Sequence, residues 1–148
     1  MVALTQDRNT PAGLGDLREG GVGASELVHA GALLMRNAAG WLVKGAAATG
    51  AVGVGRAEER VDNSGGANGA RNLRYRPGIY RFANSGGGDA LTFADIGKCC
   101  WIVDDQTVAR TSATDTRSRA GIVEMVDELG VWVRLDEALA RVATTTAA

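Results

Sequence analysis

Three side chains of this 148-residue chain could supply a nucleophile and a base: Cys99, Cys100 and the single His29. A cysteine hydrolase needs its thiol within hydrogen-bond reach of a histidine, so a small thiol enzyme using Cys99 or Cys100 is one alternative for the function. The spacing gives no reason to place His29 beside either thiol. Neighbouring strand residues point to opposite faces, so the two cysteines are also poorly placed to bridge each other. We expect them to be small apolar strand residues.

The acidic pairs are typical of turns rather than of a metal site. Asp104 and Asp105 stand between two apolar runs, as do Asp127 and Glu128, and a carboxylate there closes a turn by accepting backbone N–H bonds. One histidine cannot build a His-rich zinc site, and the glycine clusters lack the sequence of a phosphate loop. We therefore expect no catalytic residue, no metal, no cofactor and no enzyme activity.

An arginine-rich stretch, RNLRYRPGIYRF at residues 71–82, is the best candidate for binding nucleic acid. It forms a positive stripe with no acidic neighbour in sequence. The net charge of −1 gives no wider field to support binding to nucleic acid. Arginine is enriched in the cores of protein interfaces, so we favour a protein contact through Arg74, Arg76 and Arg81.

Trp132 is the second candidate for a contact. In VWVRL, alternation places Val131, Val133 and Leu135 on one face of a strand and Trp132 with Arg134 on the other. If the aliphatic set lies in the core, Trp132 points outward, and its large apolar ring is exposed to solvent unless a partner covers it. An exposed tryptophan of this kind indicates an interface.

These residues must be positioned by short strands. Residues 91–135 consist of apolar runs of about five residues, CCWIV at 99–103 among them, separated by polar turns, which is the pattern of an antiparallel β-meander. Thr92 and Asp95 have capping-box spacing, which predicts one helical turn. The length suits one domain. The predicted fold is mainly β: a small single-domain antiparallel β-barrel or sandwich with about eight strands.

Composition divides the chain into three parts. Residues 1–24 are rich in glycine without apolar periodicity, which predicts an extended N-terminal arm. Residues 25–136 form the predicted β-rich domain, and residues 137–148 a short C-terminal tail that should fray at ATTTAA. The first residues show no signal-peptide pattern, and no apolar run has the length of a membrane span, so export and a membrane partner are not expected.

Three stretches resemble the capsid decoration (head cement) proteins of tailed bacteriophages and prophages. They are ALTQDRNTP (residues 3–11), GRAEERVDNSGGANGARNLRYRPGIYRFANS (55–85) and the segment from ADIGKCCWIV to VWVRL (94–135). The resemblance implies a virion structural protein on the outer surface of the capsid, present in the host cytoplasm during assembly. Its implied partners are the phage major capsid protein and copies of itself, as a homotrimer or a dimer, without nucleic acid or membrane.

The candidate contact residues come from the arm, the arginine stretch and the outward tryptophan: Leu4, Asp7, Arg8, Pro11, Arg74, Arg76, Arg81 and Trp132. An arm that becomes ordered on a neighbouring sheet gains backbone hydrogen bonds there. The alternatives to a decoration protein are another virion part, such as a tail or fibre module, or a host-surface binder, besides the thiol enzyme.

Overall fold

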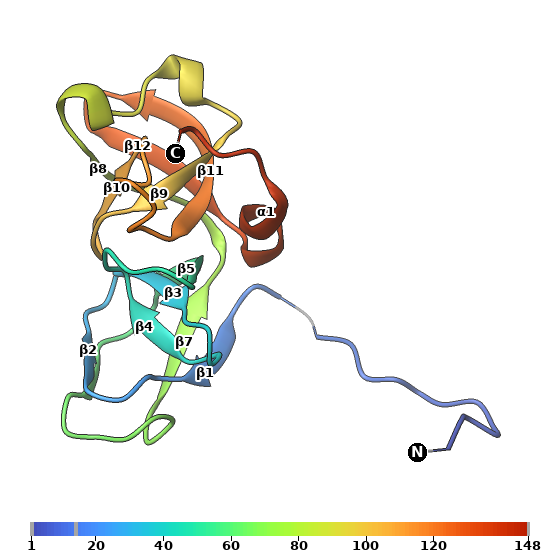
Figure 1. The fold of residues 1–148 in the computed structure, drawn as a ribbon. Helices are drawn as coiled ribbons and strands as arrows, with labels where there is room; N and C mark the ends of the chain where they lie inside the picture. The colour runs from blue at the N-terminus through green and yellow to red at the C-terminus, as the bar shows by residue number, and fades with distance from the viewer. Residues whose placement is uncertain (1, 14, 148) are drawn as a thin grey trace.

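The computed structural model of the protein describes residues 2–13 and 15–147, and it is mainly β, as predicted (Figure 1). Helical structure in the described residues is limited to two 3₁₀ turns, Gly87–Asp89 and Phe93–Asp95, and to α1 (Glu137–Val142). The strands are β1 (Arg18–Gly21), β2 (Glu26–Val28), β3 (Leu33–Arg36), β4 (Leu42–Lys44), β5 (Val52–Ala57), β6 (Val61–Asn63), β7 (Asn72–Arg76), β8 (Gly78–Asn84), β9 (Cys99–Ile102), β10 (Thr107–Ala109), β11 (Arg119–Asp127) and β12 (Gly130–Leu135).

The second half of the chain, β8 to β12, forms what we call the C-terminal lobe. Its strands pair in the order β8-β12-β11-β9-β10, and β10 returns to β8, so that the sheet closes into a small barrel. The predicted strands are confirmed, but the prediction of a simple meander is wrong: β10 lies between β8 and β9, and β11 pairs with β9 instead of with β10. The closing pair, β8 with β10, is parallel because the long connection over residues 85–98 carries the chain back before β9. Apolar side chains fill the interior: Phe82, Cys100, Ile102, Val108, Val123, Val131, Val133 and Leu135.

The first half, β1 to β7, forms the N-terminal lobe, drawn below the other in Figure 1. Its sheet runs β1-β7-β5-β3-β4, a bridge between Val22 and Leu42 joins its two ends, and β2 pairs separately with β6. Pro77 interrupts the strand, since β7 ends at Arg76 and β8 starts at Gly78 as the chain passes between lobes. Leu73 and Tyr75, which alternate with arginines along β7, are buried.

The two lobes meet where β5 crosses β11. Val52 pairs in parallel with Arg119, and beside this pair the backbone of Gly53 lies so close to Ala120 that a Cβ would overlap the Ala120 carbonyl. The Ser118 hydroxyl adds a bond across the junction by donating to the Ala48 carbonyl at 2.6 Å. Only glycine allows this approach, because any side chain would push the strands apart.

The arm is shorter than the predicted residues 1–24. Arg18–Gly21 pair with β7, and Val22 is fully buried in the core of the N-terminal lobe. The glycines that indicated a flexible segment are there for close packing: Gly20 lies against the Leu42 side chain and Gly21 against the Trp41 ring. The extended segment is therefore residues 2–13. Residues 1, 14 and 148, which fall in the predicted arm and tail, lie outside the described residues.

The C-terminal tail is packed against β9, so the prediction that it frays is wrong for the described residues up to 147. α1 is capped by Asp136, which accepts the backbone N–H of Leu139. After the helix the backbone lies parallel to the start of β9, where the Thr146 N–H donates to the Cys99 carbonyl at 3.0 Å. The Trp101 indole donates to the Ala147 carbonyl at 2.8 Å. Backbone hydrogen bonds to β9 thus hold the residues after α1 in place, although their sequence has little tendency to form a helix.

The lobe junction generates a stability prediction. Replacing Gly53→Ala should lower the free energy of unfolding by about 1–3 kcal/mol, because an added methyl overpacks a rigid strand crossing. Denaturant unfolding measures the change. The matched control is Gly86→Ala: Gly86 has open space around its Cβ position and a φ of −111°, so its stability should stay within about 0.5 kcal/mol of wild type. Equal stability of the two variants would contradict the proposed constraint.

Candidate functional site

The cysteines do not form a reactive site. Both side chains are 0% exposed, and they point into different core clusters, as expected for neighbours on a strand. Burial raises the pKa of Cys99 to about 11 and also raises that of Cys100, so neither thiol is poised to ionise at neutral pH. His29 is exposed at the end of β2. These observations give no support to the thiol-enzyme alternative.

The acidic pairs lie in turns, as predicted. Asp104 accepts the backbone N–H of Gln106 at 2.9 Å, and Asp127 accepts that of Leu129 at 2.8 Å. Within the described part of the chain, no group of three or more His, Cys, Asp or Glu side chains is arranged to hold a metal ion.

Two arginines of the stripe, Arg74 and Arg76, are paired with acidic side chains, so the stripe is less positive than its sequence suggests. Arg74 pairs with Glu59 at 2.7 Å, and hydrogen bonds from Arg74 hold the pKa of that carboxyl below its ordinary value. Arg76 pairs with Asp16 at 2.6 Å. The acidic partners lie in other segments of the chain, so the sequence of residues 71–82 alone could not reveal them. Neutralised arginines fit a protein contact better than a polyanion site.

Arg76 links Asp16, which lies between the arm and β1, to a series of side-chain interactions on the molecular surface. Besides Asp16 it lies 3.8 Å from Glu58, and Glu58 accepts a hydrogen bond from Arg56 at 2.7 Å. The Arg56 guanidinium in turn lies 4.3 Å from the centre of the Tyr80 ring, in cation–π geometry. Burial raises the pKa of Tyr80, while the charge of Arg56 opposes that rise.

Beyond Tyr80 lies an open groove of about 460 Å³, which we call the Trp132 groove. Arg81 also lines it, and its guanidinium lies 5.7 Å from the centre of the Trp132 ring. The groove thus contains two arginine–aromatic pairs, Arg56 with Tyr80 and Arg81 with Trp132. Its lining residues are Gly31, Arg56, Ile79, Tyr80, Arg81, Phe82 and Trp132.

Strand register explains why Trp132 faces outward. Trp132 pairs with Arg81 on β8 and with Met125 on β11, so the three side chains form a row across the outer face. Val131 and Val133 on either side are fully buried, as predicted. The Trp132 indole donates to Asp127 at 3.0 Å, and this bond is the main reason that the pKa of Asp127 is lowered. The ring is therefore held in place at the surface.

The predicted contact residues fall into three places. Arg76, Arg81 and Trp132 belong to the network and groove just described, while Arg74 pairs separately with Glu59. The four residues of the arm, Leu4, Asp7, Arg8 and Pro11, are exposed on a segment that extends away from both lobes (Figure 1). Sequence reasoning missed the other groove and network residues as contact residues: Asp16, Gly31, Arg56, Glu58, Ile79, Tyr80 and Phe82. Only the aromatic alternation around Tyr80 gave a local signal.

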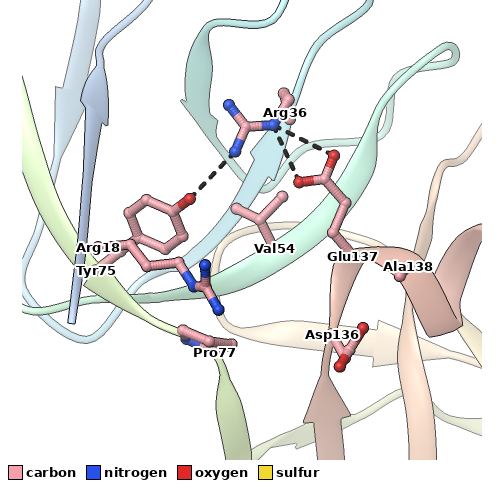
Figure 2. Close-up of a pocket in the computed structure, with 8 residues that line it drawn as sticks. All are labelled: Arg18, Arg36, Val54, Tyr75, Pro77, Asp136, Glu137 and Ala138. Atoms are coloured by element: carbon pink, nitrogen blue, oxygen red, sulfur yellow. Dashed lines mark hydrogen bonds and ion pairs between the residues drawn. The ribbon is translucent and has the colours of Figure 1, made fainter. Parts of the chain in front are cut away.

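A second cavity, a cleft of about 380 Å³, lies between β1, β7 and the start of α1 (Figure 2). Within it Arg36 donates through Nε to both carboxylate oxygens of Glu137, at 3.0 and 3.3 Å, and through Nη2 to the Tyr75 hydroxyl at 3.1 Å. Partial burial pushes the pKa of Glu137 upward, but hydrogen bonds from Arg141 and Arg36 outweigh it and leave the pKa below its ordinary value. This pair fastens α1 to the N-terminal lobe.

Comparisons of the chain with protein-family models, with curated proteins and with solved structures found no match. Among the described residues, the helices are too short and too polar for any of them to span a membrane.

The Arg36–Glu137 pair generates a prediction about pH. Because the pKa of Glu137 is lowered by folding, its charged form stabilises the protein above the ordinary glutamate pKa of about 4.3, and this contribution is lost as the pH falls through and below that value. Glu137→Gln should therefore unfold more easily by about 1 kcal/mol at pH 7 and match wild type in acid. The control is Glu128→Gln in the exposed β11–β12 turn, which should track wild type throughout. A Glu137→Gln deficit that persists unchanged in acid would contradict the assignment.

Proposed function

We propose that this protein is a capsid decoration protein, which binds the outer surface of a phage head and ties neighbouring major-capsid subunits together. The observation that carries the proposal is the Trp132 groove: Trp132, Tyr80, Arg56 and Arg81 are held at the surface of a rigid β body. Tryptophan, tyrosine and arginine are the residue types that dominate binding energy at protein interfaces. The resemblance of the three sequence stretches to decoration proteins supports the same reading.

The groove is pre-organised for binding. The Trp132 ring is fixed by its bond to Asp127 and by the Arg81 guanidinium, and the Tyr80 ring by Arg56. Side chains that are already ordered lose little conformational entropy when a partner binds. Exposed Ile79 lines the groove and exposed Met125 is paired with Trp132 across the strands, and burying such apolar surface is favourable.

Decoration would stabilise a head by mass action. A protein that binds only the expanded shell stabilises that state in proportion to its occupancy. Many copies add their modest contributions, and an arm that becomes ordered against the shell adds backbone hydrogen bonds. Under this proposal the partners are the major capsid protein and copies of this chain in a homotrimer, and the protein is found on the virion surface after assembly in the host cytoplasm.

The direct test is binding to purified expanded heads and, separately, to purified tails. We expect binding to heads, and Trp132→Ala should weaken it by about 30-fold, the cost of removing a central interface tryptophan. Phe93→Ala, which removes an exposed aromatic ring from a 3₁₀ turn, is the matched control and should bind like wild type. Binding to tails alone would assign the protein to another virion part, and no effect of Trp132→Ala would remove the groove from the contact.

The arm gives a separate prediction. Deleting residues 2–13 should weaken binding to expanded heads by about tenfold or more, since the arm loses its backbone hydrogen bonds with the shell. The thermal unfolding midpoint should not change, because those residues are exposed along their whole length. Head binding at the wild-type level by the truncated protein would show that the arm does not contact the shell.

A further inference from the structure

The Trp132 groove runs along a strand edge that has no partner. β10 pairs with β8 only at Ala83 and Asn84, so residues 78–82 of β8 have β12 on one side, and no described strand pairs with the other side. Side chains of consecutive strand residues point to opposite faces, and a hollow lined by both sets must lie at the edge of the strand. Four consecutive residues of β8 line the groove: Ile79, Tyr80, Arg81 and Phe82.

The backbone groups of Ile79 and Arg81 point to this open side. Further along the strand, the Ala83 N–H donates to the Gln106 carbonyl just before β10, at 2.8 Å, whereas the Phe82 carbonyl lies against β12. Backbone groups alternate along a strand, so those of Ile79 and Arg81 face the same side as those of Ala83. No described residue bonds them there, which leaves two N–H donors and two carbonyl acceptors.

The spacing of these groups suits an extended polypeptide. Ile79 and Arg81 are about 7 Å apart along the strand, and each offers one donor and one acceptor. Another strand presents the same repeat, and addition of a strand to a free sheet edge is a recurring mode of peptide recognition. A segment of four or five residues, about 13–17 Å long, would cover the edge up to the start of β10.

The side chains of the groove favour an acidic segment. Arg56 and Arg81 line it, and no carboxylate is among its described lining residues. Arg56 already binds Glu58, whereas the contact given for Arg81 is the face of the Trp132 ring. The nearby Asp127 carboxylate is held by the Trp132 indole. A residue opposite Arg81 on an added strand would lie on the same face as its guanidinium, where an opposite charge is favourable.

The residue two positions away in the added segment would lie beside Ile79, which is 42% exposed, so an apolar side chain fits there. Within residues 2–13 of the arm the one carboxylate is Asp7, and the residues two positions from it are Thr5 and Asn9, both polar. β8 has no carboxylate, so edge-to-edge pairing of two copies does not supply the pattern either. These sequences favour a partner protein as the source of the segment.

We infer that the free edge of β8 binds an extended acidic segment of the partner protein as an added strand, with a carboxylate beside Arg81 and an apolar side chain beside Ile79. The inference rests on the function proposed above only for the source of the segment, which is then the major capsid protein. Backbone hydrogen bonds to Ile79 and Arg81 add to the side-chain contacts of Trp132.

Amide hydrogen exchange measured by NMR tests the backbone pairing. The probe is the acetylated and amidated peptide Thr-Val-Thr-Glu-Thr, and the same peptide with Lys in place of Glu is its matched control. In the free protein the amides of Ile79 and Arg81 should exchange much faster than those of Tyr80 and Phe82, which face β12. The Glu peptide at about nine-tenths occupancy should slow the two edge amides by about tenfold, the limit set by the free fraction. Unchanged exchange at Ile79 and Arg81 would overturn the inference.

Charge exchange tests the position of the carboxylate. Wild type should bind the Glu peptide about fivefold more tightly than the Lys peptide, and Arg81→Glu should reverse this preference. Arg60→Glu, a reversal at an exposed position outside the groove, is the control and should retain the wild-type preference. A preference for the Glu peptide that persists in Arg81→Glu would contradict the inference.

The same measurements identify other occupants. Edge amides that are protected in the free protein and become exposed when residues 2–13 are deleted would assign the edge to the arm. Protection that rises with protein concentration without peptide would assign it to a second copy, and either result would overturn the inference. Expanded heads separate it from the proposed function: peptide binding without head binding would contradict the function alone, whereas head binding that Arg81→Glu leaves unchanged would contradict the inference and keep the function.

Discussion

The close approach of Gly53 to Ala120 is the constraint on which the rest of the structure depends. It lets β5 pass against β11, so that Leu33 and Met35 of the N-terminal lobe enter the core cluster of the C-terminal lobe. Both cavities are built across this junction. The Trp132 groove takes Arg56 from one lobe and Trp132 from the other, and the cleft takes Arg36 from β3 and Glu137 from α1. Neither exists in either lobe alone.

Features set by neighbouring residues could be predicted from the sequence. The outward direction of Trp132 follows from alternation along one strand, and the break at Pro77 from the missing backbone donor of proline. The Thr92–Asp95 capping box is present, and Gly97 after it has a φ of 87°, as a helix-ending glycine does. Each of these depends only on residues a few positions apart.

Features set by distant residues could not be predicted. The predicted arm extends too far along the chain because Gly20 and Gly21 indicate a loop by composition, whereas their small size allows Leu42 and Trp41 to pack against them. The arginine stretch looked positive because its acidic partners lie elsewhere, Asp16 about 60 residues before Arg76. The tail looked frayed because its pairing partner, Cys99, belongs to β9. Hydrogen bonds and ion pairs over such separations leave no local pattern.

The return of β10 to β8 limits where another strand could be added to the C-terminal lobe. Among the described barrel strands β8 to β12, each has a partner on both sides, although β8 meets β10 only through Ala83 and Asn84. A strand that is paired on both sides offers no template for strand-to-strand aggregation. Backbone pairing with another chain would therefore have to start at the unpaired side of residues 78–82 of β8, or at the two-stranded β2–β6 sheet of the N-terminal lobe.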